Sequence, residues 1–203
     1  MQILQRDRER IAGAIRAAEA KTSGEIVCVL AQSSSDTTAL PILLAALVAL
    51  ALPWLLVAFT AFSVHRILLL QTTIFIALAV LLCVPRVRTA LLPRAVRRAA
   101  AHRAATEQFF IRGIARKKDR SGILVFVSLA EHYARIIADE GIAARVSQSE
   151  WQSAVDTLVA HMRAGCIADG FVAAIEACGS VLTTYFPRTE LSRDELPDRI
   201  YVI

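Results

Sequence analysis

Four carboxylates at the ends of strand-like segments are the residues in this sequence best suited to chemistry. Glu25 opens one apolar segment, Asp119 precedes a second, and Asp139 with Glu140 closes a third. Carboxylate oxygens are the ligands that Ca²⁺ and Mg²⁺ prefer. We therefore predict that Asp119, Asp139 and Glu140 would hold a divalent cation; the alternative is that they lie in solvated turns.

Basic residues crowd the first of these carboxylates. Lys117, Lys118 and Arg120 flank Asp119, and like charges oppose a divalent cation at short range. The same residues favour a phosphate or a lipid headgroup.

Familiar catalytic motifs are absent from the sequence. There is no GxSxG, P-loop, GxGxxG, HExxH or CxxC pattern. No two histidines have metal-ligand spacing, and no two cysteines are closely spaced, so we interpret the cysteines as packing residues. The cysteines are Cys28, Cys83, Cys166 and Cys178, and the histidines are His65, His102, His132 and His161.

Hydrophobic residues are concentrated in one part of the 203-residue chain, which is 56% hydrophobic with a mean hydropathy of +0.51. Residues 39–64 and 67–84 contain no charged residue. As helices they would extend about 39 and 27 Å, and a bilayer core is about 30 Å thick. Only His65 and Arg66 separate them. We predict a two-helix transmembrane hairpin rather than a pair of buried helices in a soluble protein.

The distribution of charge predicts the orientation of this hairpin. Residues 85–120 carry eleven basic and two acidic residues, whereas the far end of the hairpin offers only Arg66. Positive charge stays on the cytoplasmic side, so we expect both termini in the cytoplasm and the chain in the inner (plasma) membrane. The basic block would rest on anionic lipid headgroups or meet a protein partner. Nucleic acid is disfavoured because exposed aromatic residues do not alternate with the basic ones.

The polar segments predict one α/β domain around this hairpin. A strand at residues 25–30 cannot satisfy its edges alone, so it must join later strands in one sheet. We divide the chain into a first domain part (1–38), the hairpin (39–84), and a basic helix with the rest of the domain (85–203). The expected elements are helices at 2–20, 94–114, 151–164 and 169–186, strands at 25–30, 122–129 and 133–139, a helix-capping box at 147–150, and an extended tail at 188–203.

Several segments together resemble the TPM domain family, including a bacterial subgroup of membrane proteins. The matching segments are residues 22–27 (TSGEIV), 109–113 (FFIRG), 118–128 (KDRSGILVFVS), 133–142 (YARIIADEGI), Trp151, Gly165, Gly170, 186–187 (FP) and 194–198 (DELPD). The resemblance implies an α/β/α sandwich: a small mixed sheet with helices on both faces. It also implies a family in which some members bind calcium or magnesium and one branch is reported as a phosphatase.

Two functional hypotheses follow. The first is a membrane-anchored cytoplasmic TPM-like domain that is a non-enzymatic scaffold or regulator, favoured because nucleophile motifs are missing. The second, which rests on the resemblance, is a divalent-metal-dependent phosphatase-like hydrolase, with Asp119, Asp139 and Glu140 holding the ion and Arg135 near the phosphate. A weaker third hypothesis is homo-oligomerisation through hydrogen bonds between hairpin helices. The residues that would make these bonds are Thr60, Ser63, Gln71, Thr72 and Thr73.

Overall fold

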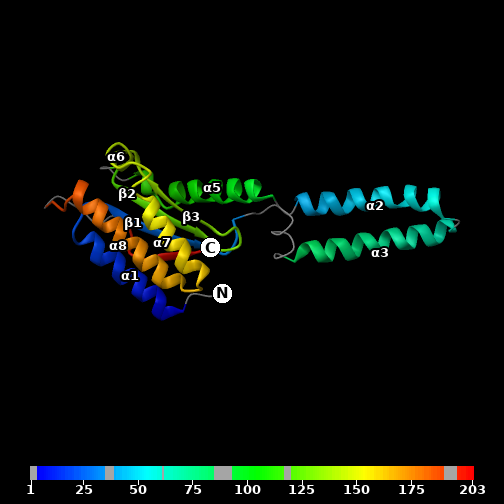
Figure 1. Cartoon of the computed structure of the whole chain (residues 1–203), viewed down its shortest axis with the longest axis horizontal. Helices are drawn as coiled ribbons and strands as arrows, with labels where there is room; N and C mark the ends of the chain where they lie inside the picture. Colours follow the sequence, from blue (N-terminus) through cyan, green and yellow to red (C-terminus); the bar gives the residue numbers. More distant parts are fainter. Residues whose placement is uncertain (1–3, 35–38, 61, 85–92, 117–119, 190–195) are drawn as a thin grey trace. The chain divides into compact units, whose positions relative to one another are not determined.

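The computed structural model describes residues 4–34, 39–60, 62–84, 93–116, 120–189 and 196–203. Its helices are α1 (Gln5–Glu19), α2 (Ala39–Phe59), α3 (Val64–Cys83), α5 (Arg94–Ile111), the 3₁₀ helix η1 (Ile114–Arg116), α6 (Glu140–Ala143), α7 (Gln152–Arg163) and α8 (Ile167–Tyr185). Its strands are β1 (Glu25–Ala31), β2 (Gly122–Ser128), β3 (Tyr133–Ala138) and β4 (Ile200–Val202) (Figure 1). Two compact units divide the chain, Met1–Ser34 with Arg98–Ile203 and Ser35–Arg97.

The first unit is built on a mixed sheet with the strand order β3-β2-β1-β4. β1 pairs in parallel with β2, and β3 pairs antiparallel with β2. Every residue of β1 and β2 is buried, as their continuous apolar sequences predict for strands covered on both faces. The strand that precedes the hairpin thus pairs with the strand that follows it.

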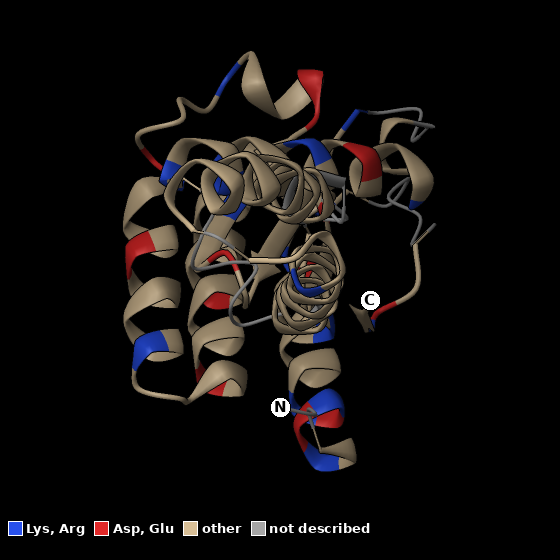
Figure 2. Cartoon of the chain, turned by 90° about the vertical axis from the view of Figure 1, so that its right-hand side faces the viewer, with Lys and Arg blue, Asp and Glu red and all other residues tan. Residues whose placement is uncertain are grey.

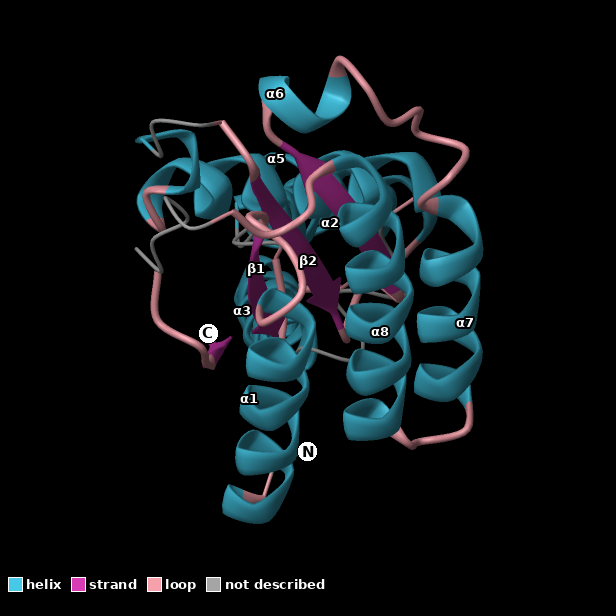
Figure 3. Ribbon diagram, turned by 90° about the vertical axis from the view of Figure 1, so that its left-hand side faces the viewer, coloured by secondary structure: helices cyan, strands magenta, loops and turns pink. Residues whose placement is uncertain are grey.

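Helices cover both faces of this sheet. On one face α1, α7 and α8 lie side by side (Figure 3). Buried residues of these helices, such as Ile11, Leu158 and Phe171, share a core with the strand residues Cys28 and Val125. On the other face α5 and η1 contribute a smaller core with Val29 and Phe126. The predicted fold class, a small mixed sheet with helices on both faces, is confirmed.

The tail departs from its expected form. Residues 200–202 form β4, which pairs in parallel with β1 from Cys28↔Ile200 to Leu30↔Val202. β1 therefore lies between two parallel neighbours. The β-branched and aromatic residues Ile200, Tyr201 and Val202 are the local signal for this strand, but its partner is more than 170 residues away in the sequence.

The second unit contains α2 and α3, which pack against each other. Both are long and apolar enough to cross a membrane, and Lys, Arg, Asp and Glu are nearly absent from them (Figure 2). The predicted connector at His65 and Arg66 is wrong, because both residues belong to the first turn of α3. The helices separate instead between α2 and Val64, where Ser63 has an extended backbone.

A third helix, α8, also meets the length and composition of a membrane span. Eight of its residues are buried, among them Phe171, Ile175 and Leu182. These side chains pack against the sheet and against α1 and α7. Helix α8 is therefore part of the hydrophobic core of the first unit.

Candidate functional site

Two of the three predicted metal ligands lie where β3 ends, and Asp119 lies outside the described residues. Because β3 runs antiparallel to β2, its end lies beside the start of β2, and the Asp139 N–H donates to the Gly122 carbonyl at 2.9 Å. The Asp139 side chain is only 3% exposed, whereas Glu140 is exposed.

A single arginine contacts both carboxylates. Nη1 of Arg120 lies 3.6 Å from Oδ1 of Asp139 and 3.5 Å from Oε2 of Glu140. Oδ1 of Asp139 also accepts the Glu140 N–H at 2.8 Å. Arg120 has a φ of +49°, in the left-handed region that non-glycine residues seldom adopt. The guanidinium thus supplies positive charge next to both predicted ligands.

One oxygen of this pair suits a cation. Oδ2 of Asp139 is buried and has no hydrogen-bond partner among the described residues, and an unsatisfied buried carboxylate oxygen is costly. No three Asp, Glu, His or Cys side chains in the described ranges lie close enough to share an ion. Asp139 and Glu140 supply two carboxylates at this point, whereas Ca²⁺ or Mg²⁺ requires six or more oxygen ligands.

Glu25 lies at the same end of the strands as Asp139. It opens β1 and pairs with Gly122, which neighbours Asp139, so two strand spacings of about 5 Å separate the Glu25 and Asp139 backbones. Glu25 is buried. A Cβ at Gly122 would lie 2.4 Å from Cγ2 of Ile114. Glycine is therefore required at position 122, where η1 packs on the start of β2.

The structure separates Arg135 from the acidic pair. Asp139 follows Arg135 by four residue steps, or about 13 Å of extended chain. Arg135 pairs with Phe126 across the sheet, and its Nη1 lies 3.2 Å from Nδ1 of His102 on α5. Arg120, rather than Arg135, contacts the two carboxylates.

Sequence reasoning missed a second buried polar cluster, which lies at the other end of the strands, where β1 and β2 finish. Glu131, in the turn between β2 and β3, is buried. It accepts hydrogen bonds from the hydroxyls of Ser33 and Ser128 and from the Ser34 N–H. The only local signal is a carboxylate three residues after an apolar strand, which usually indicates a solvated turn.

The buried cysteines are suited to packing rather than to nucleophilic chemistry. Burial raises the pKa of the Cys28 thiol well above its usual value and that of Cys178 to about 12. Both thiols are therefore protonated near neutral pH and unreactive. Cys166 precedes α8 and is exposed.

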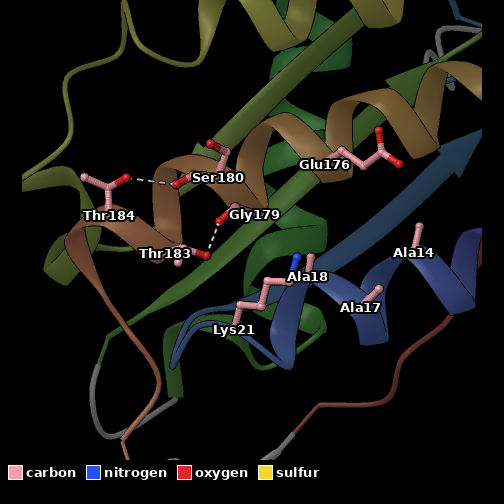
Figure 4. A pocket seen from close by; sticks show the side chains of 9 residues that line it. All are labelled: Ala14, Ala17, Ala18, Lys21, Glu176, Gly179, Ser180, Thr183 and Thr184. Carbon is pink, nitrogen blue, oxygen red and sulfur yellow. Dashed lines mark hydrogen bonds between the residues drawn. The ribbon is translucent and has the colours of Figure 1, made fainter.

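A groove of about 600 Å³ runs between α1 and α8 (Figure 4). Small side chains line most of it, and the hydroxyls of Thr183 and Thr184 donate to carbonyls of their own helix. A Cβ at Gly179 would lie 2.8 Å from that of Ala18, so glycine permits the close approach of the two helices. The lining residues are Ala14, Ala17, Ala18, Lys21, Glu176, Gly179, Ser180, Thr183 and Thr184.

The sheet with helices on both faces and the acidic strand end define the class of protein, an α/β/α sandwich. Residues 86–181 match the family model of the TPM domain, called TPM phosphatase. The predicted resemblance to the TPM domain family is therefore confirmed over these residues. β1 lies outside the matched residues although it occupies the middle of the sheet.

One solved structure supports the same fold. The BA42 protein of the psychrophilic bacterium Bizionia argentinensis, solved by NMR, is similar with a TM-score of 0.63 and 20% sequence identity. The match covers 100% of this chain and 96% of that chain. No curated protein matches the sequence.

Proposed function

We propose that this protein is an integral membrane protein that holds a TPM domain at the cytoplasmic surface. The observation that carries the proposal is the exposed apolar surface of α2 and α3, where Trp54 is 79% and Phe59 82% exposed. Apolar surface in water costs about 25 cal/mol per Å², and the two candidate spans bury only 11% and 6% of their residues within the protein. Lipid would cover this surface.

The sequence supports the proposed orientation. Eleven basic residues occur in positions 85–120, after α3, whereas the other end of the hairpin offers only Arg66. Under the positive-inside rule both termini are cytoplasmic. The basic block then faces the anionic lipid of the inner leaflet of a bacterial plasma membrane.

We further propose a non-enzymatic role as a scaffold or regulator of a protein partner at the membrane. The supporting features are the missing nucleophile motifs and the Arg120 guanidinium against both candidate carboxylates. Homo-oligomerisation through α2 and α3 has less support. The hydroxyls of Thr60, Thr72 and Thr73 already donate to carbonyls of their own helices, which leaves them only as acceptors between helices.

Membrane extraction tests the anchoring. The full chain with a carboxyl-terminal tag is expected to stay in the membrane pellet at high pH and to dissolve only in detergent. The tag is expected to be unreachable by protease from outside intact cells. A matched variant with Leu47, Leu55 and Leu69 changed to Glu is expected to leave the membrane fraction. Release of the parent chain without detergent would refute the proposal.

A divalent-metal-dependent phosphatase-like hydrolase is the second candidate. It is favoured by the unpartnered buried Oδ2 of Asp139 and by the name of the matching family. Asp119, Asp139 and Glu140 would hold Ca²⁺ or Mg²⁺, which would polarise a phosphoryl oxygen when bound.

Calorimetric titration of the detergent-purified chain with CaCl₂ and MgCl₂, together with an assay on phosphate monoesters, tests this candidate. Binding and turnover are expected to be lost in Asp139→Asn and retained in Asp156→Asn, which removes an exposed carboxylate from α7. Absence of binding and of turnover in the parent chain would exclude the hydrolase and leave the scaffold proposal intact.

A further inference from the structure

An arginine lies among apolar and aromatic residues on the inner side of an edge strand. Tyr133 and Ile137, two residues before and after Arg135 in β3, pack against the core that α5 covers. Successive side chains of a strand alternate between faces, so Arg135 points toward the same core. Its cross-strand neighbour, Phe126, is fully buried. Arg135 is half-buried, so its guanidinium is partly removed from water and partly open to a ligand. A charge that loses part of its hydration is costly unless it has a counterpart.

The group that Arg135 meets is an imidazole. Nη1 of Arg135 lies 3.2 Å from Nδ1 of His102. A guanidinium carries donors only, so Nδ1 of His102 must accept and the ring proton lies on Nε2. The paired side chains then present N–H donors from both groups.

Neither group has a carboxylate partner among the described residues. No Asp or Glu oxygen there forms an ion pair with Arg135, and its Nε is buried without a hydrogen-bond partner. Arg98, one helical turn before His102, is exposed. Positive charge and unused donors thus gather around this point without a matching acceptor.

We propose that Arg135 and His102 form a binding site for a phosphate oxyanion. Guanidinium forks bind phosphate through two parallel hydrogen bonds, and the His102 ring adds a further donor. The anion would be the phosphate of an anionic lipid headgroup or inorganic phosphate. The site is separate from the acidic pair at the end of β3. It does not require the proposed membrane role; only the source of the phosphate does.

Thermal unfolding of the full chain in nonionic detergent tests the site with inorganic phosphate as the probe. Phosphate is expected to raise the Tm above that in chloride at equal ionic strength, because a ligand that binds only the folded state stabilises it. In Arg135→Leu the affinity is expected to fall roughly tenfold or more, which is the scale of one lost charge-assisted hydrogen bond.

Two further variants separate binding from folding. Because Leu suits the apolar neighbours, Arg135→Leu is expected to keep or raise the Tm measured in chloride. Arg135→Lys keeps the positive charge but loses the two parallel N–H donors of the guanidinium. It is therefore also expected to bind phosphate weakly. Arg103→Leu removes an exposed charge from the same helix and is expected to bind phosphate as the parent chain does.

Reconstitution distinguishes the two sources of phosphate. The same variants are compared in discs of phosphatidylcholine and in discs that also contain phosphatidic acid. A stabilisation by phosphatidic acid that requires Arg135 identifies the headgroup, and one by inorganic phosphate that requires Arg135 identifies the free anion; both support the site. If neither probe stabilises the chain, or if Arg135→Leu responds as the parent does, the proposal is wrong. The anchoring proposal is decided separately by extraction.

Discussion

The backbone N–H of Ser34 donates to Oε2 of Glu131 at 3.1 Å, which joins the segment that follows β1 to the turn between β2 and β3. Ser34 is the last described residue before α2. Its hydroxyl also donates to that of Ser128 at 2.8 Å. A buried carboxylate therefore fixes the place where the chain leaves the sheet.

Replacing Glu131 with Ala is expected to destabilise the first unit. The change leaves the buried hydroxyl of Ser128 and the half-buried N–H of Ser34 without their acceptor, at a cost of about 1–3 kcal/mol for each donor that water cannot reach; the exposed Ser33 can turn to water instead. Thermal unfolding in detergent measures the loss. Glu107→Ala, on the exposed side of α5, is the control and is expected to stay within about 0.5 kcal/mol of the parent. Equal Tm values for the two variants would contradict this role for Glu131.

Two glycine substitutions are expected to change stability in opposite directions. Gly179→Val places a side chain where a Cβ alone would come within 2.8 Å of that of Ala18. The overpacking is expected to cost about 1–3 kcal/mol. Gly13→Ala in α1 meets nothing within 4 Å and is expected to stabilise the helix by about 0.5–1 kcal/mol. Denaturant unfolding of the two variants compares them, and destabilisation by both would show that the α1–α8 contact is not the cause.

The cysteines are expected to differ in reactivity. A thiol reagent added to the folded chain in detergent is expected to label Cys166, which is exposed, and to spare Cys28 and Cys178, whose pKa values burial raises. Unfolding is expected to expose both to the reagent. Mass spectrometry locates the label, with Cys166→Ser as the control. Rapid labelling of Cys28 in the native chain would contradict the buried position of β1.

Acid is expected to weaken the turn that precedes α7. The Ser147 N–H donates to Glu150 at 3.0 Å, and this hydrogen bond lowers the pKa of the Glu150 carboxyl. A carboxyl whose pKa is lower in the folded chain stabilises the fold above its unfolded pKa of about 4.3. This contribution is lost as the pH falls through the lower, folded value.

The Glu150→Gln variant measures this effect. Its Tm is expected to be below that of the parent at neutral pH, and the difference is expected to shrink as the pH falls below about 4. Glu176→Gln, an exposed change on α8, is the control. A constant difference between parent and Glu150→Gln across this range would show that the ionised carboxyl does not stabilise the turn.

The capping-box pattern at residues 147–150 forms its local hydrogen bonds in a turn that precedes the predicted helix. Ser147 and Glu150 do bond to each other, yet α7 begins later, at Gln152, after Trp151. Trp151, which is buried, is the N-cap residue of α7. The motif predicts the hydrogen bonds of the turn and, within one residue of the expected position 151, the start of the helix.

Composition and periodicity alone determined the features that depend on neighbours in the chain. Charge-free stretches predicted α2 and α3, and continuous apolar stretches predicted the buried strands β1 and β2. Each depends on hydrophobic burial or on backbone preference, which act over a few residues.

Only the tertiary structure decided which distant side chains meet. The pairing of His102 with Arg135, the bonds of Glu131 to residues almost 100 positions earlier, and the addition of β4 to β1 all depend on the register of the sheet. A one-residue shift in register moves every side chain of a strand to the opposite face, and the sequence fixes that register only through the packing of the whole core. The contacts of Arg120 with Asp139 and Glu140 arise in the same way, because adjacent strands bring the start of β2 to the end of β3.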